Sequence, residues 1–365
     1  MTGAESSNGT AYSSNNPMTT RQEPLVSVVT PVYNGERYLR ECIESVLAQT
    51  YTNWDYTIVD NCSTDRTLDI AREYAARDPR IRIHCNETFV RVIPNYNIAL
   101  RQISPNSKYC KVIAADDWLY PECLEKMIGL ADEHPNVAII GAYGLYSRPD
   151  MGVAWQGLPY SSRVIPGRDP CRAWLLGGPY VFGNPSSLLY RSDIVRSRYA
   201  FYNESNLHAD AEACLEFLEH NDFGFVHQVL SFRRVQEESL TAFSKRINTY
   251  FSGMLHGLVK YGRKYLTEDE SKRRTRECLR DYYRYLGSEF YKCRGHEFWS
   301  YHRCKLGALG YPLSPARVVA FAVCYALDLV LNPKSTTERA VRRIYRSRPV
   351  SVLLLRPAKT QTKMG

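Results

Sequence analysis

Short apolar segments alternate with amphipathic segments in the first part of this chain, and this alternation limits the folds that it can adopt. Between the apolar segments lie stretches in which apolar residues recur every three or four positions, as Leu39, Ile43 and Val46 do. Strands that alternate with helices predict a mostly parallel sheet with helices on both faces, so we expect an α/β fold. The runs of strand length are 25–34, 56–60, 81–84, 109–115 and 137–146.

Polar side chains follow three of these strand-like segments. The first segment ends in a turn at Asn34 and Gly35, the second ends at Asp60, and the fourth is followed by Asp116 and Asp117. In an open α/β sheet, ligands bind beyond the carboxyl ends of the strands. These residues are therefore expected to line one crevice, and they indicate an enzyme that handles nucleotides.

Composition divides the chain into three parts. Residues 1–23 are rich in Ser, Asn, Thr and Gly and carry few aliphatic side chains, so we expect this segment to be disordered. Residues 24–235 contain the alternating pattern and are expected to form the α/β domain. Residues 236–365 are expected to form a helical, basic C-terminal region.

Charge is distributed unevenly between these parts. Residues 1–240 contain 22 Lys and Arg against 29 Asp and Glu, whereas residues 241–365 contain 25 against 9. A basic region beside an acidic body is typical of proteins that contact an anionic surface, although a solvated helical surface can have the same composition. No nucleic-acid-binding motif accompanies the charge, so we expect no nucleic-acid partner and favour membrane headgroups.

One apolar segment of the C-terminal region raises the question of membrane contact. Residues 318–331 are apolar except for Asp328, but these fourteen residues are too few for a spanning helix, which needs about twenty. Two interpretations remain. The favoured one is a core helix of the C-terminal region, and the other is an interfacial helix on lipid headgroups, helped by the basic run 339–348.

The cysteines favour a reducing compartment. The chain has eleven, an odd number, with no C-x-x-C pair and no regular spacing, and no secretory signal is evident. We therefore expect reduced thiols and a cytoplasmic protein. No group of Cys and His has the spacing of zinc ligands, so we expect no zinc site.

Asp60 is the first candidate for ligand binding. Its carboxylate could accept a hydrogen bond from a ribose hydroxyl or from the imide N–H of uracil or thymine. The alternative is a carboxylate that interacts with the dipole of the next helix. The binding role is favoured because other ligand-binding side chains are expected in the same crevice, namely Thr30, Pro31, Tyr33 and Asn34.

Asp116 and Asp117 are candidates for metal binding. Two adjacent carboxylates at a strand end repel each other unless a positive charge lies near them. Mg²⁺ and Mn²⁺ bind carboxylate oxygens together with substrate phosphates, and would neutralise charge on a departing nucleoside diphosphate. The alternative is that one carboxylate caps the following helix while its neighbour is solvated.

Asp210 and Glu212 are two further acids, at the start of a predicted helix at 208–219. Residues two apart on a helix point in different directions, so one can face the crevice while the other packs elsewhere. A carboxylate here could act as general base on an attacking hydroxyl. The alternative is that both acids only stabilise the helix N-terminus.

Several segments of the chain resemble those of family 2 glycosyltransferases with the GT-A fold, the group that builds bacterial surface polysaccharides. The matching segments lie within residues 24–235 and are VSVVTPVYNGERYLRECIESVLAQTY, IVDNCSTDRT, AADDWLYPECL, GNPSSLLYRSDIV, ADAEACLEFLE and GFVHQVLSFRR. The resemblance implies a Rossmann-like, mostly parallel sheet flanked by helices. It also implies that a sugar passes from a nucleotide-sugar to an acceptor hydroxyl, with inversion at the anomeric carbon.

The resemblance also implies roles for individual residues. Arg91 would contact the diphosphate of a UDP-, GDP- or dTDP-sugar. Asp116 would be the acid of a D-x-D element that binds Mg²⁺ or Mn²⁺, with Asp117 beside it, and Asp210 would be the catalytic base. The residues that would hold the base and ribose are Thr30, Pro31, Tyr33, Asn34 and Asp60, and those near the sugar or acceptor are Ser186 and Ser187.

The chain departs from the family pattern at Ala114, Ala209 and Cys62, and in the segment NETFVRVIPNYN around Arg91. Many members have an acid where this chain has Ala114, so metal binding would depend on Asp116 and the diphosphate oxygens. The acid that usually precedes the base is replaced by Ala209, and Cys62 replaces a smaller residue in the DNCSTD loop.

The sequence therefore predicts an inverting, metal-dependent glycosyltransferase of polysaccharide or glycolipid biosynthesis in the cell envelope. Its acceptor would be a saccharide or a lipid-linked saccharide, and the basic region would dock it on the inner face of the cell membrane. Two alternatives stay open. One is a non-catalytic protein that binds nucleotide-sugars or polysaccharide, consistent with Ala114, and the other is a sugar nucleotidyltransferase, disfavoured because no Gly-rich basic phosphate loop follows the first strand.

Overall fold

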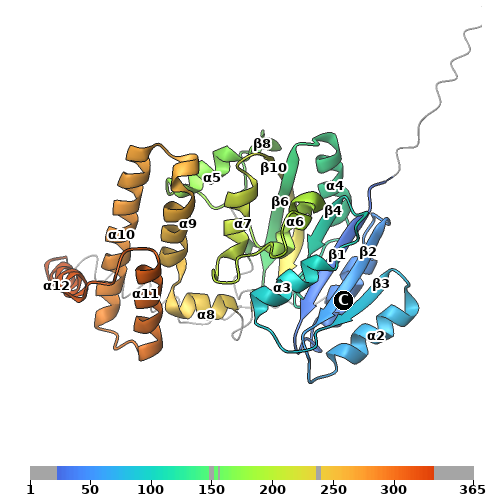
Figure 1. The fold of residues 1–365 in the computed structure, drawn as a ribbon, viewed down its shortest axis with the longest axis horizontal. Helices are drawn as coiled ribbons and strands as arrows, with labels where there is room; N and C mark the ends of the chain where they lie inside the picture. Colours follow the sequence, from blue (N-terminus) through green and yellow to red (C-terminus); the bar gives the residue numbers. More distant parts are fainter. Residues whose placement is uncertain (1–22, 148–151, 155–156, 236–239, 333–365) are drawn as a thin grey trace, which may run out of the picture.

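A twisted sheet occupies one half of the molecule and a group of helices occupies the other half (Figure 1). The computed structural model describes residues 23–147, 152–154, 157–235 and 240–332. The ten strands within these residues are β1 (Val26–Val32), β2 (Trp54–Asp60), β3 (Ile81–Cys85), β4 (Tyr109–Val112), β5 (Trp118–Leu119), β6 (Val137–Tyr146), β7 (Gly152–Ala154), β8 (Val164–Pro166), β9 (Leu188–Arg191) and β10 (Asp222–Arg233).

The described strands form one sheet in the order β3-β2-β1-β4-β9-β6-β10-β5, with β7 paired to β6 and β8 to β10. Six strands run in one direction, namely β1 to β4, β6 and β10, which confirms the expected mostly parallel sheet. β9 lies antiparallel between β4 and β6. β4 ends three residues before the end predicted for that strand, since the chain turns after Val112 toward the crevice.

Helices cover both faces of the sheet. One apolar cluster joins the sheet to α1, α2 and α4, and a second cluster joins it to α3, α5 and α7. The helices are α1 (Leu39–Leu47), α2 (Thr67–Arg77), α3 (Val92–Arg101), α4 (Cys123–Glu133), α5 (Arg168–Leu175), α6 (Ser192–Arg196), α7 (Ala209–Phe217), α8 (Leu240–Ile247), α9 (Tyr250–Tyr265), α10 (Glu268–Phe290), α11 (His296–Ala308) and α12 (Pro315–Leu331), with a 3₁₀ turn η1 at Pro185–Ser187.

The C-terminal helices share a core with the sheet domain. The second cluster runs without a break from Val29 in β1 through Leu215 in α7 to Leu255 in α9 and Leu306 in α11. α10, its longest helix, begins at a capping box in which Thr267 and Glu270 satisfy each other's backbone N–H groups. The basic region predicted from composition is therefore helical over its described part and is packed against the helix that carries Asp210.

α12 is the element for which the favoured interpretation of the sequence was wrong. It begins at Ser314, whose hydroxyl accepts from the Arg317 N–H, and only Val318 and Ala322 along it are buried. A core helix would bury most of its apolar residues. α12 instead lies across α10 at the end of the molecule farthest from β3 (Figure 1).

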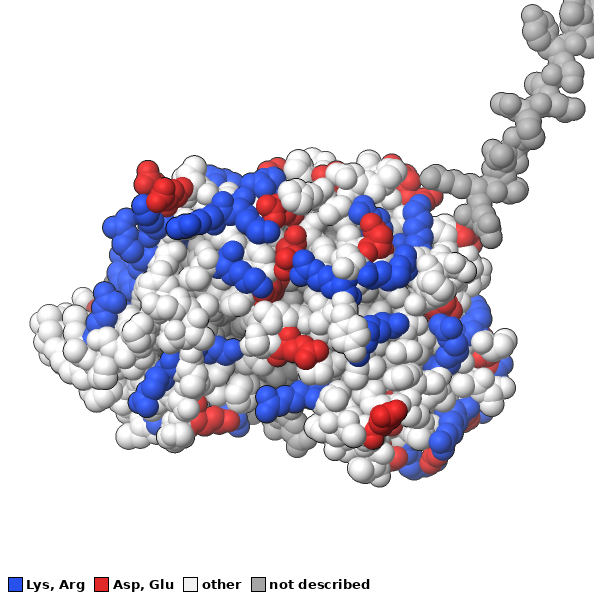
Figure 2. All heavy atoms as spheres, in the orientation of Figure 1, with Lys and Arg blue, Asp and Glu red and all other residues white. Residues whose placement is uncertain are grey.

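No helix in the described residues is both long enough and apolar enough to span a bilayer. Lys and Arg side chains gather along the outer edge of α10, next to the uncharged surface over α12 (Figure 2).

Candidate active site

The carboxyl ends of β1 and β2 meet at the edge of the sheet where the sequence predicts the ligand crevice. The two strands are parallel, and Val32 at the end of β1 lies opposite Asp60. The Asn34 N–H donates to Ser63 Oγ at 3.0 Å, and the Thr64 N–H donates to Asn34 Oδ1 at 2.8 Å. These bonds join the turn after β1 to the loop after β2, so Asn34 and Asp60 lie at the same edge.

Asp60 has a carboxylate that the protein satisfies only in part. The residue is 3% exposed. Oδ2 accepts from the Ser63 N–H at 3.2 Å, whereas Oδ1 is buried and has no hydrogen-bond partner among the described residues. A buried carboxylate oxygen without a donor is unfavourable. A hydrogen-bond donor on a bound molecule would stabilise it.

The residues predicted from β1 and the turn after it lie in two environments. Thr30 and Pro31 are buried, and Thr30 Oγ1 shares a hydrogen bond of 2.8 Å with the Tyr56 hydroxyl. Their side chains are packed in the core below the crevice and are not available to a ligand, unlike the prediction. Tyr33 and Asn34 follow the strand and are exposed, as ligand contacts would have to be.

Phe89 is a candidate that the sequence reasoning missed. Its ring packs edge-on against Tyr33 with 4.8 Å between the ring centroids, and both rings are about half exposed, at 58% and 48%. Asn61 holds this loop in place, since its side chain accepts from the Val90 N–H at 3.0 Å and donates to the Val90 carbonyl at 2.8 Å. Arg91 comes next, exposed at the N-cap of α3. An exposed aromatic beside a strand-end loop was the missed signal.

Asp117 is held by protein groups on both of its oxygens. Oδ2 accepts from Ser186 Oγ at 2.6 Å and Oδ1 accepts from the Arg234 N–H at 3.0 Å. Burial, together with the neighbouring charge of Asp116, raises the pKa of Asp117 to about 7. This geometry does not support the prediction that Asp117 binds a metal ion. Asp117 instead joins the loop after β4 to η1 and to the end of β10.

Asp116 is partly exposed, and its backbone is bonded to the residue that follows β10. The Asp116 carbonyl accepts from Arg234 Nε at 3.2 Å. The Arg234 guanidinium lies 3.9 Å from the centroid of the Tyr38 ring and donates to Glu41 at 2.7 Å. The described residues contain no group of three or more His, Cys, Asp or Glu that could hold a metal. The donor set at Asp116 therefore fits a metal only if phosphate oxygens complete the coordination.

Asp210 lies near charged groups that also affect the strand-end acids. Burial raises its pKa, and the positive charges of His208 and Arg233 partly offset that effect. Arg233 also lowers the pKa of Asp117. The Tyr96 hydroxyl, on α3, is buried within range of the charges of Asp116, Asp117 and Asp210, and its pKa is raised by burial and then by these acids. Asp116 and Asp210 are far apart in the chain, yet both lie within electrostatic range of the Tyr96 hydroxyl.

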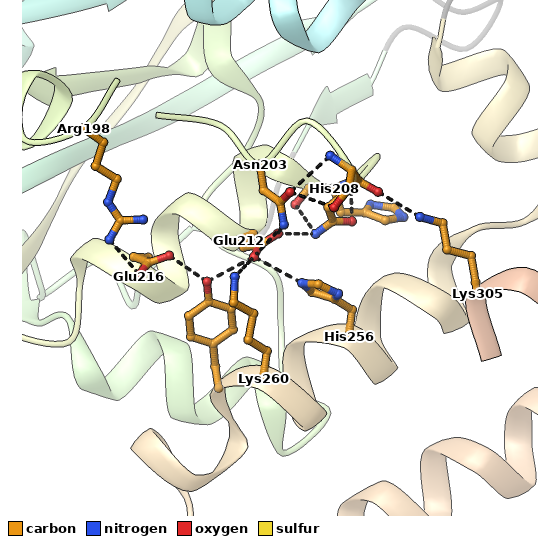
Figure 3. Close-up of polar contacts among 11 residues, drawn as sticks. Arg198, Asn203, His208, Glu212, Glu216, His256, Lys260 and Lys305 are labelled. Atoms are coloured by element: carbon orange, nitrogen blue, oxygen red, sulfur yellow. Dashed lines mark hydrogen bonds and ion pairs between the residues drawn. The ribbon is translucent and has the colours of Figure 1, made fainter. Parts of the chain in front are cut away.

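Glu212 is surrounded by polar side chains of the preceding loop and of α9 (Figure 3). Its carboxylate accepts from Asn203 and Asn206 in the preceding loop and from Lys260 Nζ on α9 at 2.6 Å. His256 Nε2 lies 3.2 Å away. Burial would raise the pKa of Glu212, but the neighbouring His256 and the hydrogen bonds from Lys260 and Asn206 outweigh it and hold that pKa well below its usual range. Glu212 therefore attaches α7 to the C-terminal helices.

Comparison with known proteins identifies the family of the chain. Residues 27–182 match the family model described as Glycosyl transferase family 2. EpsE of Bacillus subtilis, which is named as a glycosyltransferase, is 30% identical over 230 residues, which cover 62% of this chain and 78% of that protein.

Solved structures show the same fold at low identity. Residues 1–349 of Staphylococcus aureus TarS, in complex with UDP-GlcNAc, align with a TM-score of 0.57 at 17% identity and cover 78% of this chain and 80% of that one. A mannosyltransferase from Pyrobaculum calidifontis, in complex with GDP-Man and Mn²⁺, aligns with a TM-score of 0.50 at 16% identity over 90% and 89% of the chains. The fold is GT-A, and the chain belongs to glycosyl transferase family 2 and is a glycosyltransferase.

Proposed function

We propose that the chain transfers a sugar from a nucleotide-sugar to an acceptor hydroxyl, with inversion at the anomeric carbon and with the help of a divalent metal ion. The observation that carries the proposal is that Asp116 and Asp210, far apart in the chain, both lie within electrostatic range of the Tyr96 hydroxyl, with Arg233 near Asp210. One acid there can face the diphosphate while the other faces the acceptor. Two acids with such different tasks need to be separate in sequence but close in space.

The donor's nucleoside would bind between the strand-end loops. Asp60 Oδ1 would accept from a ribose hydroxyl or a base N–H, since this oxygen is buried without a partner among the described residues. Tyr33 and Phe89 would flank the base, and Arg91 would approach the diphosphate from the start of α3. Uracil, thymine and guanine all carry an N–H that a carboxylate can accept, so UDP-, dTDP- and GDP-sugars all fit this description.

The diphosphate would lie near Asp116. A Mg²⁺ or Mn²⁺ ion held by Asp116 and the phosphate oxygens would neutralise the charge that develops on the leaving group. Asp117 would act as a positioning residue, since its bonds to Ser186 and Arg234 fix the loop that presents Asp116. Arg233 adds a positive charge near Asp117.

Asp210 would be the general base. As the acceptor hydroxyl attacks the anomeric carbon, the hydroxyl proton moves to the Asp210 carboxylate and the bond to the diphosphate oxygen breaks. Burial raises the pKa of Asp210, which makes its carboxylate a stronger base. A single displacement of this kind inverts the anomeric configuration.

The acceptor would be a saccharide or a lipid-linked saccharide of the cell envelope. TuaG of Bacillus subtilis, which is named as a teichuronic acid biosynthesis glycosyltransferase, is 33% identical over 129 residues, which cover 35% of this chain and 50% of that protein. We propose a cytoplasmic enzyme that works as a peripheral protein on the inner face of the membrane, where such an acceptor is presented.

Release of nucleoside diphosphate tests this function. Wild type and Asp210→Asn are incubated with UDP-, GDP- and dTDP-sugars and Mn²⁺, with thermal shift as the binding measurement. We expect one donor class to stabilise both proteins, and the variant to release diphosphate about 10²- to 10⁴-fold more slowly. Binding with no release by wild type would favour the non-catalytic alternative, and equal rates would exclude Asp210 as the base.

A further inference from the structure

We propose that α12 and the adjoining face of α10 form a surface that docks the protein on an anionic lipid membrane. This surface, called here the α10–α12 surface, names the contact for the peripheral location proposed above and rests on that proposal. Its apolar residues are Val319, Val323, Leu327, Val330 and Leu331, and its basic residues are Arg273, Arg276, Arg280 and Arg284.

α12 has one buried side and one exposed apolar side. Val318 and Ala322 pack against α10, whereas Val323 and Leu327 are 50% and 53% exposed and Leu331 is 73% exposed. At 100° per residue the exposed apolar residues fall on one face, directed away from the buried pair. A helix that presents such an apolar face to the outside has the form of an interfacial helix.

The crossing of the two helices is close and well packed. A Cβ on Gly287 of α10 would lie 2.7 Å from the Phe321 backbone, so the helices approach without an intervening side chain. The Tyr291 hydroxyl donates to the Ala322 carbonyl at 3.0 Å, and the rings of Tyr283 and Phe321 stack. α12 is therefore held rigidly on α10, with its exposed apolar face directed outward.

The arginines lie on the face of α10 that α12 crosses. Arg273, Arg276, Arg280 and Arg284 follow one another at intervals of three or four residues, which places them in line with Gly287 along the helix. At 1.5 Å per residue this row begins about 5 Å from the crossing and extends to about 20 Å from it. All four side chains are exposed, and Figure 2 shows Lys and Arg side chains along the edge of the molecule next to the uncharged surface over α12.

Little acidic charge offsets this row. Asp281 pairs with Arg284 at 3.0 Å and with Arg280 at 3.6 Å. Arg276 donates to the Lys272 carbonyl, so its charge is not paired with an acid among the described residues. The chain beyond Asn332 adds nine Lys and Arg against one Glu. The charge of α10 and the composition of this C-terminal segment thus both favour an anionic partner.

A lipid surface fits this combination better than another macromolecule. Anionic headgroups attract arginines, and the zone below them accepts apolar side chains at a depth of about 5–10 Å. α12 projects beyond α10 by about the diameter of a helix, so its apolar face can enter that zone while the arginines reach the headgroups. Nucleic acid would use the arginines but would leave the apolar face in water.

Co-sedimentation of the full chain with vesicles tests the proposal without donor or acceptor, so its result does not depend on transfer activity. Wild type is mixed with phosphatidylcholine vesicles, and with vesicles that contain about one third phosphatidylglycerol, at low and high salt. Val323→Asp removes an apolar contact, and its matched control is Val259→Asp on α9, where the valine is 42% exposed. Arg276→Glu/Arg280→Glu has Arg72→Glu/Arg77→Glu on α2 as its control.

We expect wild type to bind the anionic vesicles, and salt to weaken the binding. Val323→Asp and the α10 charge reversal should each lower the affinity by about tenfold or more, and the controls should change it by about twofold at most. Absence of wild-type binding at low salt would overturn the proposal, as would equal effects of variants and controls.

Three other outcomes would assign the surface to another occupant and also overturn the proposal. If Val323→Asp lowers the melting temperature well below that of Val259→Asp, the chain covers its own apolar face. If wild type dimerises and Val323→Asp does not, a second copy covers it. If single-stranded RNA binds the α10 arginines and displaces the vesicles, the partner is a nucleic acid.

Discussion

Asp210 and Glu212 are separated by a single residue at the start of α7, yet they lie in opposite surroundings. Asp210 lies near the positive charge of Arg233, and burial raises the pKa of Asp210. Glu212 lies 2.6 Å from Lys260 of α9, and hydrogen bonds to it outweigh burial and lower its pKa. One helical turn thus carries the proposed base and attaches it to the C-terminal helices.

Glu212→Gln is expected to destabilise the protein near neutral pH by about 1–3 kcal/mol, because the charge that satisfies Lys260 and His256 is lost. The folded-state pKa of Glu212 is lowered, so its contribution is present above about pH 4.3, the unfolded value, and is lost as the pH falls through the folded value. Urea unfolding should therefore show a gap between wild type and variant that narrows in acid. Glu219→Gln, which removes an ion pair to Lys264 of the same helix, is the control. Equal losses for both variants at neutral pH would contradict the prediction.

Asp60→Asn is expected to weaken donor binding by about tenfold or more, because a hydrogen bond to a charged acceptor contributes about 1.5–3 kcal/mol. The stability of the Asp60→Asn variant should differ little from that of wild type, since Asp60 Oδ1 has no partner among the described residues. Asp65→Asn is the contrasting control, because both Asp65 oxygens accept from protein donors, among them the N–H groups of Glu36 and Thr67. That variant should lose stability rather than donor affinity. Titration calorimetry and thermal unfolding separate the two effects, and a reversed pattern would refute this assignment.

Asp117 should make stability fall as the pH rises through the weakly acidic range. Its folded-state pKa of about 7 lies above the unfolded value, so the folded protein binds more protons between about pH 4 and pH 7. Over that window the free energy of unfolding should decline in wild type relative to Asp117→Asn, which carries no titrating group. Urea unfolding at several pH values measures the difference. If the difference in the free energy of unfolding between wild type and Asp117→Asn stays constant with pH, the raised pKa of Asp117 is contradicted.

We expect the dependence of donor turnover on a divalent metal ion to require Asp116. Chelation of divalent ions is expected to lower donor turnover by wild type, because charge on the departing diphosphate would lose a counter-ion. Asp116→Asn should turn over the donor slowly even with metal present, and chelation should lower its turnover only a little further. Asp132→Asn, at a distant acid that pairs with Lys108, is the control and should respond to chelation like wild type. Full activity of the chelated wild type would rule out the metal.

The strands and their polar ends were predictable because each depends on residues that are near one another in the chain. The alternation of apolar and amphipathic segments located β1, β2 and β6 within a few residues. The placement of β9 between β4 and β6 was not predictable, since pairing across a sheet joins segments about fifty to eighty residues apart in the chain. α12 was misjudged because apolar composition does not tell a buried helix from one whose apolar face stays exposed.

Local patterns were enough to place Asp60, Asp116 and Asp210 at the ends or starts of their elements, because strand termination and helix initiation depend on a few neighbouring residues. Contacts between distant segments were needed to learn which side chains remain available for chemistry. The Thr30 hydroxyl is hydrogen-bonded to Tyr56, and the Asp117 carboxylate is hydrogen-bonded to Ser186 and Arg234. Glu212 is hydrogen-bonded to Lys260 of α9. Each of these partners reaches its residue only when the sheet and the C-terminal helices pack together, and a buried polar group then bonds to whichever donor lies nearest.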